Sequence, residues 1–164
     1  MEALRALYES LELREPQSYV QSGNIIFKTG ERNLVRLAGR IEAAIEGSFG
    51  FRTDVILRTA ADLRDAIARN PFRARPDIDP RKLLVTFLAS DPGEQARENI
   101  RGLKTDPEEL WIYGRELYVY FPNGMARPKL SWPRIEKTLK TPGTGRNWNS
   151  VTRLLEMAEK MERS

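Results

Sequence analysis

The stretch from Thr144 to Asn149, TGRNWN, contains the residues best suited to bind an anion. Gly145 lets the backbone approach a ligand closely, and Arg146 can donate two parallel hydrogen bonds to a phosphate or a carboxylate. Asn147 or Thr144 is suited to cap a following helix, whose first N–H groups are unpaired and favour a negatively charged partner. These residue types predict an anion site at the start of the last helix.

A purely structural interpretation of the same stretch stays open. Trp148 falls in phase with Val151 and Leu155, which places it on the apolar face of the last helix. Asn147 and Asn149 would then only satisfy backbone groups. On this interpretation, only the arginine and its neighbouring backbone remain as candidates for ligand binding.

Positive charge is concentrated just before and within this stretch. The chain has a net charge of +4, but residues 126–153 alone carry +6 and the remainder carries −2. The basic residues of this region are Arg127, Lys129, Arg134, Lys137, Lys140, Arg146 and Arg153. An acidic partner would meet the chain here, and Arg127 and Lys129 could bind a phosphate together with Arg146. The alternative is a solvated basic face without a ligand.

A second candidate site is the turn Ser22-Gly23-Asn24, which lies between two short apolar runs. The backbone N–H groups of such a turn can form an anion-binding nest, with Ser22 and Asn24 beside it. The alternative is a tight polar turn that needs glycine only for its geometry.

The composition excludes several kinds of chemistry. The chain has no Cys and no His, so disulfides, thiolate nucleophiles and His-based triads are absent. There is no P-loop, dinucleotide fingerprint or Gly-x-Ser-x-Gly elbow, and the clustered carboxylates lack the spacing of a calcium loop. We therefore expect no metal and no cofactor. Any catalysis would use Lys, Arg, Tyr, Ser, Thr or carboxylates.

Targeting signals are also absent from the sequence. The first residues, MEALRALYES, form a charged helical start rather than a secretory signal, and no apolar run reaches the roughly 20 residues of a membrane span. We expect a cytoplasmic protein without membrane contact. Arg outnumbers Lys by 20 to 7, which is typical of a GC-rich bacterial genome.

Hydrophobic periodicity predicts the elements that would position these residues. Helical spacing predicts helices over residues 2–13, 31–48 and 92–100, a last helix whose apolar face runs from Trp148 to Met161, and shorter helices after Thr59 and Ser131. Apolar runs predict a hairpin over 19–27, strands at 53–57 and 83–89, and a hairpin over 110–121. Tyr118 and Tyr120 share one face of the last hairpin. Packing in the sheet is the simpler interpretation of these tyrosines, and stacking on nucleic-acid bases is the alternative.

This order of elements predicts an α+β fold. We expect two ferredoxin-like α/β subdomains with antiparallel or mixed sheets covered by helices, each lacking one strand of the βαββαβ pattern. Residues 71–80 contain three prolines and are predicted to form a linker. The subdomains would then span residues 1–70 and 81–164.

Four stretches together resemble the domain-of-unknown-function family 1697 (DUF1697). They are SYVQSGNIIF at 18–27, NPF at 70–72, GRELYVYFPNGMARPKL at 114–130 and TPGTGRNWNSVTRLLEMA at 141–158. The resemblance covers nearly the whole chain. It implies a bacterial α+β protein with ferredoxin-like character and no established activity, so it assigns no catalytic residue.

The N-terminus departs from the pattern of that family. Its members usually begin with a strand and a glycine-rich loop before the first helix, and Met1 of this chain lies just after that segment. We expect either a truncated reading frame or a first half that rearranges or recruits a strand from another chain. Recruitment would produce a homodimer through an unpaired sheet edge.

The leading functional hypothesis is a small binding module for an anionic, phosphate-bearing ligand, either a nucleotide or nucleic acid. The first alternative is an enzyme without His or Cys that acts on a small anionic substrate; a deep pocket where Arg146 meets a carboxylate or a tyrosine would favour it. The second alternative is a homo-oligomeric interaction protein.

Overall fold

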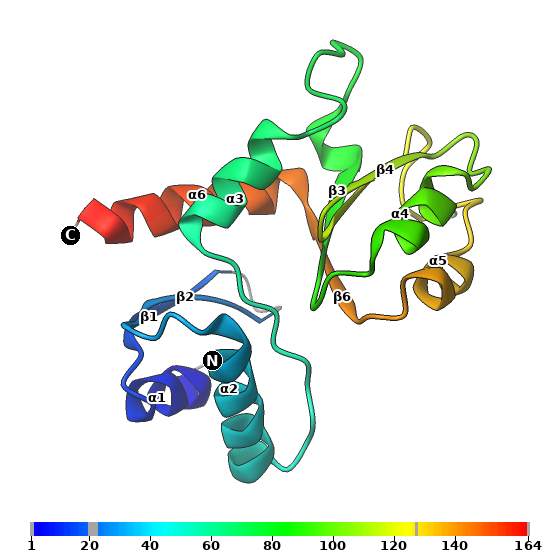
Figure 1. Ribbon diagram of the computed structural model, residues 1–164. Coiled ribbons are helices and arrows are strands. Elements are labelled where there is room, and N and C mark those ends of the chain that lie inside the picture. The colour runs from blue at the N-terminus through cyan, green and yellow to red at the C-terminus, as the bar shows by residue number, and fades with distance from the viewer. Residues whose placement is uncertain (1, 20–22, 127, 164) are drawn as a thin grey trace. The chain divides into compact units, whose positions relative to one another are not determined.

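The computed structural model describes residues 2–19, 23–126 and 128–163 and divides the chain into two compact units (Figure 1). Residues 1–60 together with 153–164 form the first unit, and residues 61–152 form the second. Helices accompany an antiparallel sheet in each unit, so the predicted α+β class is confirmed. No helix formed by the described residues has both the length and the apolar composition needed to cross a membrane.

The segment predicted as a linker belongs to the second unit. The prolines keep residues 71–80 out of long helices and strands, but Phe72 is buried and its ring centroid lies 5.9 Å from that of Tyr120. Arg75 forms an ion pair with Glu109 of the same unit at 2.6 Å. The units therefore divide after Ala60 and not within residues 71–80.

The first unit is built on a hairpin and two helices. Its elements are α1 (Glu2–Ser10), β1 (Arg14–Tyr19), β2 (Asn24–Lys28) and α2 (Leu34–Phe49). The two strands pair antiparallel, as predicted for this region. Leu37, Ile41 and Ile45 recur at four-residue spacing along α2 and are buried in one core. This apolar stripe is what orients α2 toward the rest of the unit.

The strand predicted at residues 53–57 is wrong, because residues 51–59 form no strand. Val55 and Leu57 still pack against the core of the first unit. The N–H of Val55 donates to the carboxylate of Glu42 at 2.8 Å. The alternation of Val55 and Leu57 therefore indicates burial correctly. A strand also needs hydrogen bonds to the backbone of a neighbouring strand, and here the side chain of Glu42 in α2 accepts the hydrogen bond from Val55 instead.

The second unit contains a four-stranded sheet in the order β4-β5-β3-β6, in which every neighbouring pair is antiparallel. Its elements are α3 (Ala60–Ala68), the short helix η1 (Pro80–Lys82), β3 (Leu83–Leu88), α4 (Glu94–Arg101), β4 (Glu109–Tyr113), β5 (Glu116–Tyr120), α5 (Trp132–Leu139) and β6 (Gly143–Asn147). Helix α6 (Trp148–Arg163) begins in this unit and belongs to the first unit from Arg153 onward. The nearly continuous apolar run of β3 lies inside the sheet, as predicted.

Helices α4 and α5 lie side by side against one face of this sheet (Figure 1). Leu117 and Val119 of β5 share a buried core with Ile100 of α4 and Ile135 of α5. This shared core fixes both helices to the same surface of the sheet.

The opposite face of the sheet buries the two tyrosines of β5. The hydroxyl of Tyr118 donates to the carbonyl of Ala66 in α3 at 2.5 Å, and burial raises the pKa of Tyr118. The hydroxyl of Tyr120 accepts from the N–H of Asp79 at 3.1 Å. Both side chains are almost fully buried, so neither ring is presented for stacking on a base.

Candidate anion-binding surface

The stretch of residues 144–149 runs from a strand into the last helix, which begins at Trp148. Residues Gly143–Asn147 form β6 and pair with β3 along their whole length. Side chains of β3 pack closely over both glycines. A Cβ at Gly143 would stand 2.9 Å from Cγ2 of Thr86, which is too close, and one at Gly145 would stand 3.3 Å from a methyl group of Leu84, which is a tight contact. Gly145 therefore lies within a strand and not at the start of a helix, and its approach to a ligand stays a prediction. Gly145 serves close strand packing.

Arg146 lies on the same face of the sheet as Val85, the residue directly opposite it on β3. Its Nη1 donates to Oγ1 of Thr144 at 2.6 Å and to the carbonyl of Gly145 at 2.8 Å. The side chain is partly buried, and burial lowers the pKa of its guanidinium. These contacts hold the guanidinium close to its own strand.

Asn147 caps α6, and it is one of the two residues predicted to cap this helix. Its Oδ1 accepts from the N–H of Ser150 at 2.8 Å, so it occupies one of the otherwise unpaired donors of the helix. Trp148 is only partly buried, whereas Val151 is fully buried. Trp148 therefore does not occupy the core position expected for it, and the apolar face of α6 is first fully buried at Val151, one turn later.

Lys129 lies between β5 and α5, and its backbone is bound to a buried carboxylate. Oε1 of Glu108 accepts from the N–H of Lys129 at 2.6 Å and from that of Leu130 at 2.8 Å. Glu108 directly precedes β4, so the segment is tied to the β4 edge of the sheet. Arg146 lies on β6, at the opposite edge, three strand spacings or about 14 Å away. The two cations therefore do not converge on one phosphate.

The remaining predicted residues are not gathered with these two. Ser22 and Arg127 lie outside the described residues. Asn24 is buried in the first unit, where its Nδ2 donates to the carbonyl of Tyr19 at 3.0 Å. This bond joins the two ends of the hairpin strands, which gives the amide a structural role.

The structure instead gathers basic residues on α5 and its two ends. Ser131 caps the helix by accepting from the N–H of Arg134 at 3.3 Å, and Ile135 and Leu139 bury one side of it. Arg134 and Lys137 are three residues apart, so they are neighbours on the side opposite the core. We call the exposed cations of this helix and its flanks the α5 basic surface: Lys129, Arg134, Lys137 and Lys140.

Within the described ranges, none of these four side chains forms an ion pair. Glu136 is the one acidic residue of α5. The sequence shows the surplus charge of this region, but assigning it to one helix surface requires the spacing of Arg134 and Lys137 to be read against Ile135 and Leu139. This spacing is a signal that the sequence itself contains.

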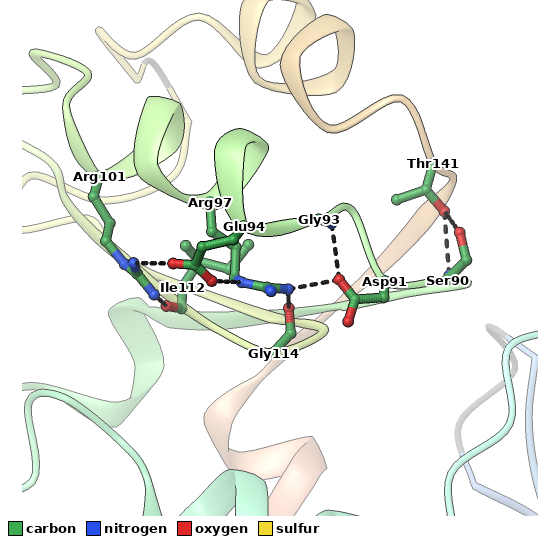
Figure 2. Close-up of polar contacts among 9 residues, drawn as sticks. All are labelled: Ser90, Asp91, Gly93, Glu94, Arg97, Arg101, Ile112, Gly114 and Thr141. Carbon is green, nitrogen blue, oxygen red and sulfur yellow. Dashed lines mark hydrogen bonds and ion pairs between the residues drawn. The ribbon is translucent and has the colours of Figure 1, made fainter.

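Helix α4 carries arginines that are paired. Nη1 of Arg97 donates to Asp91 at 2.7 Å, and its Nε donates to Glu94 at 2.9 Å. Figure 2 draws both contacts. Arg101 donates to Glu94 at 3.1 Å and to the carbonyl of Ile112 at 3.0 Å. Hydrogen bonds from Arg97 and then Arg101 hold the pKa of Glu94 below its usual range, and bonds to Glu94 and then Asp91 raise the pKa of Arg97. The charge on α4 is thus largely neutralised at short range.

Comparison with known proteins gives a family and a fold. The family model described as "Protein of unknown function (DUF1697)" matches residues 1–118. A solved structure, that of the conserved bacterial protein SP0830 from Streptococcus pneumoniae, is similar with a TM-score of 0.66 and 22% sequence identity, over 96% of this chain and 88% of that one. No curated protein matches the chain. The structural likeness supports the α+β fold alone.

Proposed function

The chain belongs to the family described as protein of unknown function (DUF1697), a description that names no activity, and we propose from the structure that the chain binds nucleic acid, a phosphate-bearing polyanion, through the α5 basic surface. The observation that carries the proposal is that all four cations of this surface are exposed and that none pairs with a described carboxylate. Unneutralised cations attract the phosphate backbone and release its counterions on binding.

The spacing of these cations favours a polyanion over a mononucleotide. Arg134 and Lys140 are six residues apart, which corresponds to about 9 Å along a helix axis. Cations that point outward over such a length meet successive phosphates more readily than they converge on one.

The distribution of charge supports the same location. Of the seven basic residues between 126 and 153, Arg146 is held along β6 and Arg153 pairs with Glu156 at 3.1 Å. The α5 basic surface therefore holds most of the excess positive charge of this region.

The ferredoxin-like character implied by the family resemblance is part of the proposal for the second unit. The order β3-α4-β4-β5-α5-β6 follows the βαββαβ pattern, with β6 as the strand that the local sequence did not predict. This pattern leaves the outer side of α5 free of the sheet, which is where the cations lie.

Fluorescence anisotropy with labelled single-stranded and double-stranded oligonucleotides tests the proposal. If the four cations contact phosphates, the logarithm of the binding constant should fall with the logarithm of salt concentration at a slope of about −3 to −4. The double variant Arg134→Glu/Lys137→Glu should weaken binding at low salt by about tenfold or more.

The double variant Arg32→Glu/Arg36→Glu is the matched control. Both arginines are exposed, both lie in the first unit, and their reversal changes the net charge by the same amount. The control should retain most of the affinity. Equal weakening by the two double variants, or no binding of either oligonucleotide at low salt, would contradict the proposal.

A further inference from the structure

The register of the β3–β6 ladder determines which backbone groups of β6 are used. The N–H of Ala89 donates to the carbonyl of Pro142 at 2.8 Å, and this pair continues the ladder by one step. In an antiparallel ladder, every second pair exchanges hydrogen bonds. Thr144 and Arg146, two and four residues further along β6, therefore bond to β3 through their backbones.

The alternate residues of β6 direct their N–H and C=O groups away from β3. These residues are Gly143, Gly145 and Asn147, and all three are exposed. β6 is the last strand in the sheet order, and no strand among the described residues pairs with its outer side. Such an edge is a template for pairing with another chain.

Arg146 covers the middle of this edge. Its Nη1 donates to the carbonyl of Gly145, which is the central outward acceptor of the strand, at 2.8 Å. Its second contact, to Oγ1 of Thr144, holds the side chain parallel to the strand. A charged donor thus occupies the position that the N–H of an added strand would need.

The opposite edge of the sheet carries the same arrangement. Tyr113 and Glu116 close the β4–β5 hairpin as a bonded pair, so the backbone of Ile112 points outward. Nη2 of Arg101 donates to the carbonyl of Ile112 at 3.0 Å (Figure 2). Both edges of one sheet therefore have an outward carbonyl bound by a guanidinium.

We propose that Arg146 prevents β6 from pairing with β6 of a second copy of this chain, and that Arg101 protects the β4 edge in the same way. A second β6 could pair antiparallel with the first, with Gly145 facing Gly145 across a two-fold axis. Pairing would require the guanidinium to leave the carbonyl of Gly145 and would bury its charge beside the new strand, which is unfavourable. The homodimer through an unpaired edge would then form only when the arginine is removed.

The variant Arg146→Val tests this inference, because it removes the guanidinium and leaves a side chain that favours strands. Light scattering over a concentration series should show a monomer for the unmodified chain and a mass that doubles for the variant. Amide exchange locates the contact: the N–H groups of Gly145 and Asn147 should exchange fast in the unmodified chain and become protected in the variant.

Arg134→Val is the matched control, since it removes an exposed arginine of the same unit that does not contact a sheet edge. It should remain monomeric, and so should Arg146→Lys, because a lysine on an edge strand also opposes pairing. Arg146→Thr replaces Arg146→Val if the latter does not fold. A folded Val or Thr variant that stays monomeric with an unprotected Gly145 overturns the proposal, and so does dimerisation of the unmodified chain with a protected Gly145.

Discussion

Helices α4 and α5 lie beside each other on one sheet face, yet their basic residues have opposite environments. On α4, the side chain of Arg97 is 14% exposed and contacts Asp91, Glu94 and the carbonyl of Gly114. On α5, Arg134 and Lys137 are exposed and form no ion pair within the described part of the chain. A count of basic residues therefore says little about anion binding until their acceptors are located.

The difference between the two helices originates in short sequence separations. Glu94 precedes Arg97 by three residues and Asp91 precedes it by six, so the acceptors of α4 are placed by the helix and the loop before it. Helix α5 has a serine cap and a proline in its first turn, and its single acidic residue is Glu136. Few local carboxylates leave its cations available to an external anion.

Truncation of the core residues under the two helices should have the largest effect, and it should be the same for both. Ile100 of α4 and Ile135 of α5 are almost fully buried in one core. Ile100→Ala and Ile135→Ala should each lower the free energy of unfolding by about 2–5 kcal/mol in urea titrations. Val35→Ala is the control, because Val35 is 85% exposed and its truncation should change stability by no more than about 0.5 kcal/mol. A small loss at only one isoleucine would show that the helices are not anchored alike.

Truncation of one arginine on each helix should then separate them. Arg97→Ala removes the hydrogen bonds that Arg97 donates to Asp91, Glu94 and the carbonyl of Gly114, so it should lower the free energy of unfolding by about 1–2 kcal/mol. Arg134→Ala breaks no contact with another side chain that the structure shows, and the change should stay within about 0.5 kcal/mol. Equal losses in denaturant titrations would mean that the pairs on α4 contribute no net stability.

Local signals predicted much of the fold. Apolar periodicity located α2, the hairpins and β3, and Ser131 was recognised as the start of α5, because each of these features depends on neighbours within a few residues. β6 was missed because GTGRN has two glycines and no apolar run. It forms a strand because the side chains of Thr86 and Leu84 on β3 pack over those glycines. That contact lies far away in the sequence.

The candidate site was less predictable than the fold, for a related reason. Lys129 and Arg146 are 17 residues apart in the sequence, but the strand order separates them. The backbone of Lys129 is bound to Glu108, next to the edge strand β4, whereas Arg146 lies on the other edge strand, β6. Strand order depends on how the whole second unit packs, which a local pattern does not encode. The cations of α5 are different, because their arrangement follows from helical spacing alone.

Acid should reveal the smallest difference between the two helices. The N–H of Gly93 and then Arg97 lower the pKa of Asp91, and Arg97 and then Arg101 lower that of Glu94. A carboxyl whose folded-state pKa lies below its unfolded value of about 4 stabilises the fold fully above that pH, and this contribution is lost as the pH falls through the folded-state value. The free energy of unfolding should therefore fall more steeply below about pH 4 in the unmodified chain than in Asp91→Asn/Glu94→Gln.

The acid effect should be small, because the side chains of Asp91 and Glu94 are 63% and 59% exposed and solvent screens their pairs. Urea titrations at several acidic pH values measure it, and about 1 M salt should reduce the difference between the two proteins. If the acid profile of the double variant superimposes on that of the unmodified chain, the ion pairs of α4 do not stabilise the fold. The contrast with α5 would then lie only in whether the arginines are available to an external anion, which is the property that the oligonucleotide titration measures.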